Sequence, residues 1–196
     1  QIRSEYLKEY KRPCLVKAST GSGKSTRIPI WLLEEDIPFI LIQPRRVLVR
    51  SLHKYLNPFC DGRLSYQIRF ESHFVNNPRA LIVTPGIFLN HLQSGFPFEP
   101  KLILIDEAHE RSREIDFALA ILKHRKFSPI TLLSATLDNI EISHYLDFKT
   151  FELEQARFKI DLVYSEHSLL PSFVDLEDQI RKNLKLNLHH SALVFL

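Results

Sequence analysis

The 196-residue sequence contains no methionine, one tryptophan and only two cysteines. Two cysteines are too few for a disulfide framework, and Cys14 and Cys60 lack the spacing of metal ligands. We therefore expect both to be reduced thiols that pack in the interior. The nine histidines follow no ligand pattern either, so the sequence indicates neither a disulfide-stabilised domain nor a zinc site.

Long apolar runs and a strong charge bias are also missing. No run approaches the roughly 20 apolar residues that a membrane-spanning helix needs, and the first residues lack the pattern of a signal peptide. We therefore expect no membrane partner and a cytoplasmic location. The formal net charge of +3 permits an acidic partner without predicting one.

What the sequence does contain is a regular alternation of short apolar runs and amphipathic stretches of helical length. This alternation predicts βαβ units, and so an α/β fold with a mostly parallel sheet covered by helices on both faces. The runs expected to form buried strands are residues 14–17, 39–42, 80–83, 102–105 and 130–133. A further strand at 159–164 is expected to complete a domain that spans residues 1–164.

A polar or glycine-containing segment follows each of these five runs. The segments are Ser19-Thr-Gly-Ser-Gly-Lys24, Gln43-Pro-Arg-Arg46, Thr84-Pro-Gly86, Asp106-Glu-Ala-His109 and Ser134-Ala-Thr136. Open α/β sheets bind their ligands outside the carboxyl ends of the strands. We therefore expect these segments to share one edge, where a nucleotide and a second ligand are bound.

The first segment has the pattern of a phosphate-binding loop. Gly21 and Gly23 allow a bare backbone to curl around phosphates. Lys24 is placed to reach the β and γ oxygens, and Ser25 to offer a hydroxyl to Mg²⁺. Together with the helix N-terminus that follows, the expected phosphate cradle comprises Gly21, Ser22, Gly23, Lys24, Ser25 and Thr26. An ordinary strand-to-helix connection is the alternative if this segment is taken alone.

The fourth segment places carboxylates at the end of an apolar strand. Asp106 is expected to hold Mg²⁺ together with Ser25, and Glu107 is the candidate that orients and deprotonates the attacking water. Taken alone, the two acidic residues also fit the start of an ordinary loop. Because both segments occur in this order within one domain, we interpret the chain as a nucleoside triphosphatase that uses Mg²⁺. Its candidate catalytic residues are Lys24, Asp106, Glu107 and His109.

Arg45 and Arg46 begin a basic stripe that continues with Arg50 and Lys54 at helical spacing. A stripe of this kind beside the phosphate-binding edge suits the backbone of a nucleic acid. Taken alone, it fits a solvated helix face at least as well.

Six motifs occur in order along the chain: Gly21-Ser-Gly-Lys-Ser-Thr26, Gln43-Pro-Arg-Arg46, Tyr66-Gln-Ile-Arg-Phe-Glu71, Thr84-Pro-Gly86, Asp106-Glu-Ala-His-Glu-Arg111 and Ser134-Ala-Thr-Leu-Asp138. With them, nearly the whole chain resembles the DEAH-box helicases of superfamily 2, particularly the bacterial members of the DEAH/RHA group. The resemblance implies the RecA-like P-loop fold of that family. It also implies an ATP-dependent helicase that moves 3′ to 5′ on single-stranded nucleic acid, with RNA preferred and DNA possible.

The resemblance also implies roles for individual residues. His109, Ser134 and Thr136 resemble the elements that couple the γ-phosphate site to domain movement, although Ser134 and Thr136 also suit a cap on the chain leaving the sheet. Contacts to the backbone of the bound strand are implied for Arg45, Arg46, Thr84 and Gly86. Two positions depart from the family. Pro85 stands where many relatives carry Asp, and Tyr55 stands where eukaryotic members often stack an arginine on the adenine. For both Tyr55 and Phe70, a ligand contact and a place in the core are equal alternatives.

The last part of the chain is expected to leave this domain. Residues 165–172 are expected to form a linker, and residues 173–196 the truncated beginning of a second RecA-like domain whose arginine fingers are missing. An arginine finger is worth about 10³–10⁵ in rate, so we expect these 196 residues alone to bind weakly and hydrolyse ATP slowly. The alternatives are a nucleic-acid-remodelling scaffold with little turnover, a DNA helicase, and a P-loop kinase, which leaves the Pro-Arg-Arg and Ser-Ala-Thr segments unexplained.

Overall fold

The computed structural model describes residues 2–19, 21–127, 129–136 and 147–153. The strand predicted at 159–164, the linker at 165–172 and the start of a second domain at 173–196 lie outside these residues and stay predictions. The helices are α1 (Ile2–Glu9), α2 (Lys24–Glu34), α3 (Arg46–Leu56), α4 (Pro85–Ser94) and α5 (Arg113–His124), and the 3₁₀ turns are η1 (Asn57–Cys60) and η2 (Ala108–Glu110). The strands are β1 (Cys14–Ala18), β2 (Phe39–Ile42), β3 (Leu64–Ile68), β4 (Glu71–His73), β5 (Ala80–Val83), β6 (Leu102–Ile105), β7 (Ile130–Ser134) and β8 (Lys149–Leu153).

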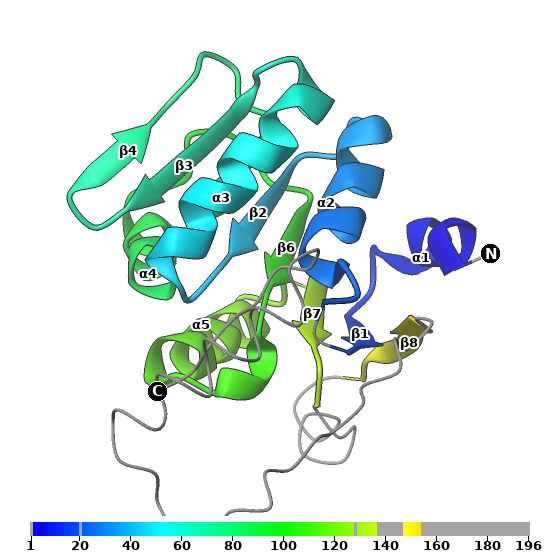
Figure 1. The fold of residues 1–196 in the computed structure, drawn as a ribbon. Coiled ribbons are helices and arrows are strands. Elements are labelled where there is room, and N and C mark those ends of the chain that lie inside the picture. Colours follow the sequence, from blue (N-terminus) through cyan, green and yellow to red (C-terminus); the bar gives the residue numbers. More distant parts are fainter. Residues whose placement is uncertain (1, 20, 128, 137–146, 154–196) are drawn as a thin grey trace, which may run out of the picture. The chain divides into compact units, whose positions relative to one another are not determined.

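These strands form one sheet in the order β4-β3-β5-β2-β6-β7-β1-β8 (Figure 1). Neighbouring strands run parallel except β3 and β4, which form an antiparallel hairpin. The predicted α/β fold with a mostly parallel sheet is therefore confirmed. All five strands predicted within the described residues are present, and β1 and β7 each extend one residue further than expected.

Three strands, β3, β4 and β8, were not predicted from the sequence. β8 is an edge strand in which only Phe151 is buried, and β4 consists of the polar residues Glu71, Ser72 and His73. In β3, Ser65 and Gln67 interrupt the apolar residues. Strands toward the edges of a sheet are covered less completely than central ones, so they lack the continuous apolar runs by which the central strands were predicted.

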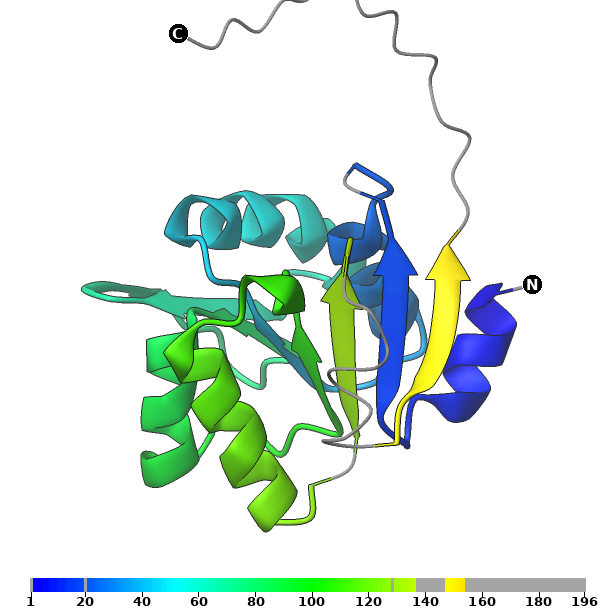
Figure 2. The same ribbon diagram turned by 90° about the horizontal axis from the view of Figure 1, so that it is seen from below.

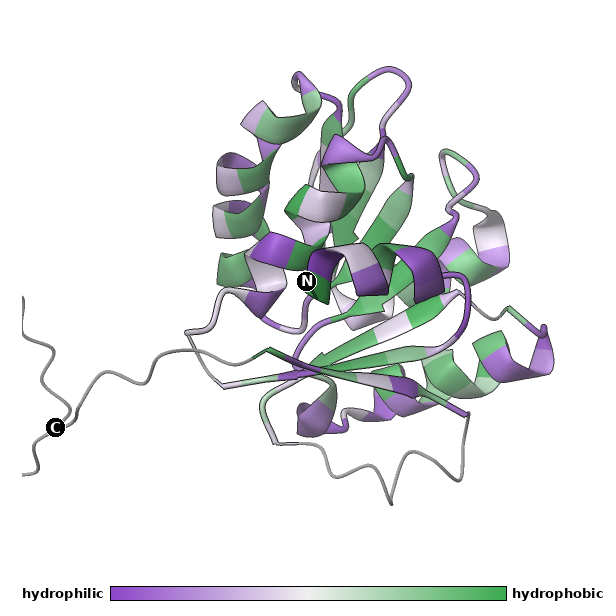
Figure 3. Cartoon of the chain, turned by 90° about the vertical axis from the view of Figure 1, so that its right-hand side faces the viewer, coloured by the Kyte–Doolittle hydropathy of each residue, from purple (hydrophilic) through white to green (hydrophobic). Residues whose placement is uncertain are grey.

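Helices cover both faces of the sheet, as predicted. Figure 2 shows α2 and α3 on one side of the sheet and α4 and α5 on the other. Successive side chains of a strand point to opposite faces. In β2, Phe39 and Leu41 join the core that packs against α2 and α3. Ile40 and Ile42 join the core that packs against α4 and α5. The central strands β2, β5 and β6 are therefore apolar at every position, and most of the sheet has the colours of hydrophobic residues in Figure 3.

Helix α1 is attached to the sheet through Tyr6. Its ring packs edge-on against Phe151 of β8, with the ring centroids 5.7 Å apart. Its hydroxyl hydrogen-bonds with Oγ1 of Thr131 at 3.0 Å. Both residues are completely buried, so this bond satisfies two polar groups that no water reaches.

Cys14 on β1 and Cys60 in η1 are free and buried, which confirms the expectation of packing thiols. Burial raises the pKa of both thiols, that of Cys14 to about 12. In the described part of the chain, no helix combines the length and the hydropathy that crossing a membrane requires.

The register of the sheet brings the predicted ligand-binding segments to one edge. Ile42 pairs with Val83 on one side and with Ile105 on the other, so the segments that follow these three residues leave the sheet side by side. Lys17 pairs with Ser134, which places the end of β7 beside the strand that leads into the phosphate-binding loop. The site is therefore assembled by parallel strand pairing between segments far apart in the sequence.

Candidate active site

The loop between β1 and α2 has the backbone geometry of an anion cradle. Gly21 and Gly23 both have φ = 80°, a left-handed conformation that is unfavourable for residues with a Cβ atom. Gly23 immediately precedes α2 and offers no side-chain cap to its first N–H groups. Such uncapped N–H groups at a helix N-terminus are suited to phosphate oxygens. Oγ of Ser22 is buried and makes no hydrogen bond in the described structure, so this loop also holds a polar group that a ligand can satisfy.

Lys24 begins α2 and is paired with Glu107. Its Nζ lies 3.2 Å from Oε1 of Glu107, and only 4% of the Lys24 side chain is exposed. A buried ammonium needs a partner of opposite charge. The structure therefore brings the predicted phosphate-binding lysine and the predicted base into direct contact across 83 residues of sequence.

Asp106 is completely buried where β6 ends. Its Oδ1 accepts a hydrogen bond from the Glu107 N–H at 2.9 Å, and its Oδ2 accepts one from Nε2 of Gln43 at 2.7 Å. Burial raises the pKa of the Asp106 carboxyl, while a hydrogen bond with Ser25 acts in the opposite direction. The carboxylate thus contacts both the phosphate-binding loop and the segment after β2.

Ser25 and Asp106 fit the Mg²⁺ ion predicted from the sequence. Both supply oxygen atoms, and the Ser25 hydroxyl is near enough to Asp106 to lower the pKa of its carboxyl. No group of three or more His, Cys, Asp or Glu side chains in the described residues has the arrangement of a metal site. Mg²⁺ takes one or two protein ligands and completes its shell with phosphate and water, so the two oxygen-bearing side chains are enough for it.

Glu107 adopts a strained backbone conformation. Its φ is 49°, and that of Arg111, on the other side of η2, is 45°. Residues other than glycine rarely adopt this conformation, and such residues cluster at functional sites. Ala108 is buried in the core on the α5 side of the sheet, and it anchors the turn between the two strained residues.

His109 lies between Glu107 and Ser134. Its Nδ1 is 3.4 Å from Oε2 of Glu107 and 3.5 Å from Oγ of Ser134. The backbone N–H of Thr136 donates to the same Ser134 oxygen at 3.3 Å. The capping alternative and the coupling alternative for Ser134 are therefore compatible, because one hydroxyl contacts both the departing chain and His109.

The predicted nucleic-acid residues lie at the same edge. Arg45, with 68% of its side chain exposed, donates to Oε1 of Glu110 at 2.9 Å. Arg46 donates to the backbone carbonyl of Arg69 at 3.0 Å. Thr84 immediately precedes α4. In the first turn of that helix, a Cβ atom at Gly86 would meet no atom within 4 Å, so the backbone there is open to approach.

The basic stripe is less continuous than the sequence suggests. Arg50 forms an ion pair with Glu71, whose other hydrogen-bond partner is the hydroxyl of Tyr66. Arg50 therefore braces the β3–β4 hairpin against α3.

Two aromatic residues are exposed for which the sequence allowed either a place in the core or a contact with a ligand. Phe70, at the tip of the β3–β4 hairpin, has 89% of its surface exposed, and Tyr55, on α3, has 53%. The core alternative is therefore wrong for both. Tyr55 packs against Phe59, with the ring centroids 5.9 Å apart.

Gln43 was not predicted to belong to the site, although it opens one of the motifs. Its carboxamide contacts Asp106, and it is 1% exposed. The available signal was its position, a polar residue directly after the apolar run 39–42.

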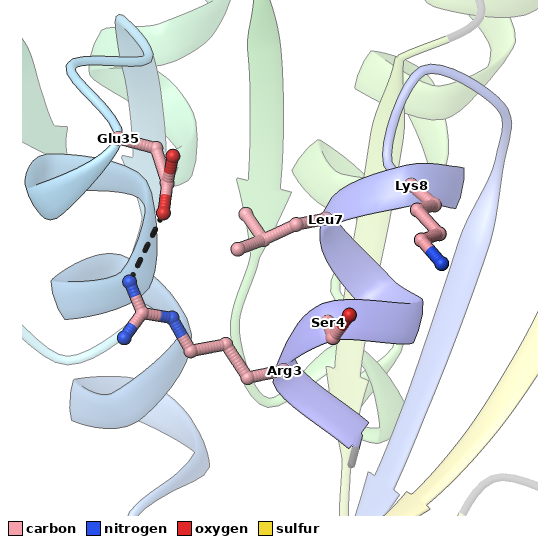
Figure 4. Close-up of a pocket in the computed structure, with 5 residues that line it drawn as sticks. All are labelled: Arg3, Ser4, Leu7, Lys8 and Glu35. Atoms are coloured by element: carbon pink, nitrogen blue, oxygen red, sulfur yellow. Dashed lines mark hydrogen bonds and ion pairs between the residues drawn. The ribbon is translucent and has the colours of Figure 1, made fainter.

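One pocket lies away from this edge. It has a volume of about 500 Å³ and is lined by Arg3, Ser4, Leu7, Lys8 and Glu35 (Figure 4). Arg3 spans the gap between α1 and the end of α2 through its hydrogen bond with Glu35. The pocket shares no residue with the predicted site, and we assign it no role.

Comparison with known proteins gives consistent matches. Residues 1–143 match the family model described as DEAD/DEAH box helicase. ATP-dependent RNA helicase DHX29 of Homo sapiens is 37% identical over an alignment of 167 positions, which covers 72% of this chain and 12% of that protein. ATP-dependent RNA helicase HrpA of Escherichia coli (strain K12) is 29% identical over an alignment of 205 positions, which covers 93% of this chain and 16% of that protein.

A solved structure has the same fold. The crystal structure of the Escherichia coli DEAH/RHA helicase HrpB matches with a TM-score of 0.78 and 26% identity, over 95% of this chain and 26% of that chain. This match confirms the RecA-like helicase fold predicted from the motifs. The present chain spans well under a fifth of the length of DHX29 and HrpA.

Proposed function

Because the chain belongs to the DEAD/DEAH box helicase family, we propose that it supplies the first RecA-like domain of an ATP-dependent helicase of the DEAH type. The proposed protein moves 3′ to 5′ along single-stranded RNA. In this proposal the domain comprises residues 1–164, followed by a linker at 165–172 and the start of a second RecA-like domain at 173–196. A cytoplasmic location and the absence of a membrane partner belong to the same proposal.

The observation that carries this proposal is the contact between Lys24 and Glu107. A lysine from the loop after β1 and a carboxylate from the segment after β6 meet beside a buried Asp106. A strand-to-helix connection alone has no need of a buried lysine, and an ordinary loop has no need of a buried aspartate. Their convergence supports a site for a phosphate-bound cation.

ATP would be held mainly by the cradle that comprises Gly21, Ser22, Gly23, Lys24, Ser25 and Thr26. The N–H groups of this loop and of the first turn of α2 donate to phosphate oxygens, and Lys24 compensates the β and γ charge. Ser25 and Asp106 would hold Mg²⁺, which supplies neutralisation of the charge on the phosphate oxygens.

Glu107 is the proposed general base. In the structure its carboxylate is paired with Lys24. When the Lys24 ammonium pairs with phosphate oxygens instead, the Glu107 carboxylate loses its cationic partner. It is then available to accept a proton from the attacking water. His109 contacts both Glu107 and Ser134. Through Ser134 and Thr136 it would relate the state of the γ-phosphate site to movement of the chain beyond β7.

The proposed nucleic-acid contacts are Arg45, Arg46, Thr84 and Gly86. Positively charged side chains and exposed backbone at one edge suit the phosphates of a strand, and such contacts recognise charge and shape more than sequence. RNA is proposed as the substrate because DHX29 and HrpA are named RNA helicases. A DNA helicase stays the alternative, which parallel binding to RNA and DNA strands of equal length distinguishes.

A remodelling scaffold with little turnover is the other alternative. The chain retains the complete set of candidate residues for hydrolysis: Lys24, Ser25, Asp106, Glu107 and His109. A scaffold that does not hydrolyse ATP does not require this complete set, so an enzyme is favoured. The proposal is tested by binding of the fluorescent nucleotide mant-ATP to this chain. Affinity that requires Lys24 and increases with Mg²⁺ supports the proposal, whereas no binding by the folded chain contradicts it.

A further inference from the structure

Gln43 is held in a fixed place between the two functional segments. It directly follows β2, its N–H donates to the carbonyl of Val83 at 2.9 Å, and the N–H of Asp106 donates to the carbonyl of Ile42, also at 2.9 Å. The side chain is 1% exposed. Neighbouring strands on both sides therefore fix the backbone from which this carboxamide extends.

The Gln43 carboxamide uses both of its polar ends. Nε2 donates to Oδ2 of Asp106 at 2.7 Å, and Oε1 accepts the backbone N–H of Arg45 at 3.1 Å. A carboxylate has no proton to donate to Asp106, and an aliphatic side chain makes neither bond. A single buried amide thus connects the proposed magnesium ligand to the main chain of a proposed RNA contact.

Arg45 is linked to the segment after β6 a second time, through its side chain. Its guanidinium donates to Glu110 in η2, and the N–H of Glu110 donates to the carbonyl of Glu107 at 2.9 Å. Glu110 accepts from Nε and Nη2 of Arg45, so a phosphate that approaches this edge of the guanidinium competes with Glu110 for these donors. Such a phosphate therefore acts on a residue that is connected to Asp106 through Gln43 and to Glu107 through Glu110.

We propose that Gln43 is a positioning residue that orients the Asp106 carboxylate for magnesium-bound nucleotide and makes this orientation depend on whether Arg45 holds a nucleic-acid phosphate. The inference rests on the proposed function and adds to it the residue that joins the two ligands. Coupling of this kind is reciprocal, so nucleotide bound with Mg²⁺ changes RNA affinity by the same factor as RNA changes nucleotide affinity.

The test uses Gln43→Leu in the 196-residue chain, with Gln67→Leu as the matched control. Gln67 lies on β3, and its amide contacts His91 instead of Asp106. The first readout is the Mg²⁺ concentration that half-saturates the increase in mant-ATP affinity. The second readout is the change in mant-ATP Kd caused by a saturating single-stranded oligouridylate.

Gln43→Leu is expected to leave the mant-ATP Kd measured in EDTA unchanged, because the phosphate cradle is intact. It is expected to raise the half-saturating Mg²⁺ concentration by about 10- to 100-fold, the usual effect of removing a partner that orients a metal ligand. The effect of the oligouridylate on Kd is expected to become smaller, because the link from Arg45 to Asp106 is removed while the link through Glu110 stays. Gln67→Leu is expected to match the wild type in all three measurements.

Thermal unfolding shows whether Gln43→Leu is folded. If it is not, Gln43→Asn replaces it, because the shorter amide keeps the polarity of the site but cannot span from Asp106 to the N–H of Arg45. A folded Gln43 variant with wild-type Mg²⁺ dependence and a wild-type response to the oligouridylate overturns the inference. A wild-type chain that is folded but binds no mant-ATP overturns the proposed function instead, and the inference with it.

Discussion

Nζ of Lys24 lies 3.2 Å from Oε1 of Glu107, so that the lysine proposed to bind phosphate and the carboxylate proposed to activate water form an ion pair. In the proposed function, phosphate oxygens replace the carboxylate as the partner of Lys24. The two residues therefore affect binding and hydrolysis in different ways, which their substitutions can separate.

Lys24→Ala is expected to weaken mant-ATP binding by about 10- to 100-fold, which corresponds to the roughly 1.5–3 kcal/mol of a hydrogen bond to a charged group. Glu107→Gln is expected to bind at least as tightly as the wild type, because the carboxylate that competes for Lys24 is removed. Fluorescence titration of both variants with mant-ATP checks this. A large loss of affinity in Glu107→Gln would show that Glu107 helps to hold the nucleotide.

Gly23→Ala is expected to lower both stability and nucleotide affinity. An alanine at φ = 80° is strained, and its Cβ would lie 3.4 Å from Oγ1 of Thr26 in the first turn of α2. Gly62→Ala is the control, since Gly62 has φ = 74° and a Cβ there would meet no atom within 4 Å. Both variants are expected to lose about 1–2 kcal/mol of stability. Equal mant-ATP affinity in the two variants would exclude a special role for the backbone of the phosphate-binding loop.

Glu110→Gln is expected to strengthen binding of single-stranded RNA. The substitution removes the carboxylate that occupies the exposed Arg45 guanidinium. Because exposed ion pairs contribute about 0–1 kcal/mol, the gain in affinity is expected to reach at most about fivefold. Glu114→Gln, on the exposed first turn of α5, changes the net charge equally and serves as control. The same gain in both variants, measured by fluorescence anisotropy, would assign the effect to net charge.

Tyr6→Phe is expected to destabilise the fold by about 1–3 kcal/mol, because it leaves the buried hydroxyl of Thr131 without its partner. Tyr10→Phe, directly after the same helix, is expected to change the free energy of unfolding much less. Urea denaturation followed by circular dichroism measures both. Equal stability of Tyr6→Phe and the wild type would show that the buried hydroxyl pair contributes nothing to the attachment of α1.

The buried thiol of Cys14 predicts a loss of stability at alkaline pH. Its pKa rises from an ordinary value of 9.0 to about 12 on folding, because burial disfavours the thiolate. The contribution to stability is therefore complete below about pH 9 and is lost as the pH rises toward 12. Cys14→Ala is expected to lose part of this alkaline sensitivity in urea denaturation. An unchanged pH profile would exclude Cys14 as its source.

The central part of the fold was predictable because buried parallel strands consist of consecutive apolar residues. Residues 39–42 and 102–105 have this pattern and form β2 and β6 at the predicted positions. The edge strand β8, with Phe151 as its one buried residue, depends on pairing with β1 instead of on its own composition. The hydrophobic pattern of the sequence therefore does not predict such a strand.

The candidate site was predictable in its residue types but not in its contacts. The motifs identify Lys24, Asp106 and Glu107 as candidates because phosphate and Mg²⁺ require such groups. The contact of Gln43 with Asp106 arises only because β2 pairs with β6. That pairing, and with it the position of Gln43 in the site, belongs to the register of the sheet and cannot be seen in either segment alone.

The most direct test of the proposed function is the rate of ATP hydrolysis by the longer protein proposed to contain this chain, with and without single-stranded RNA, beside its Glu107→Gln variant. We predict that RNA raises the rate and that the rate of the variant is about 10²- to 10⁴-fold lower, which is the contribution of a general base. A rate that ignores both RNA and single-stranded DNA, or that survives the substitution, would contradict the account.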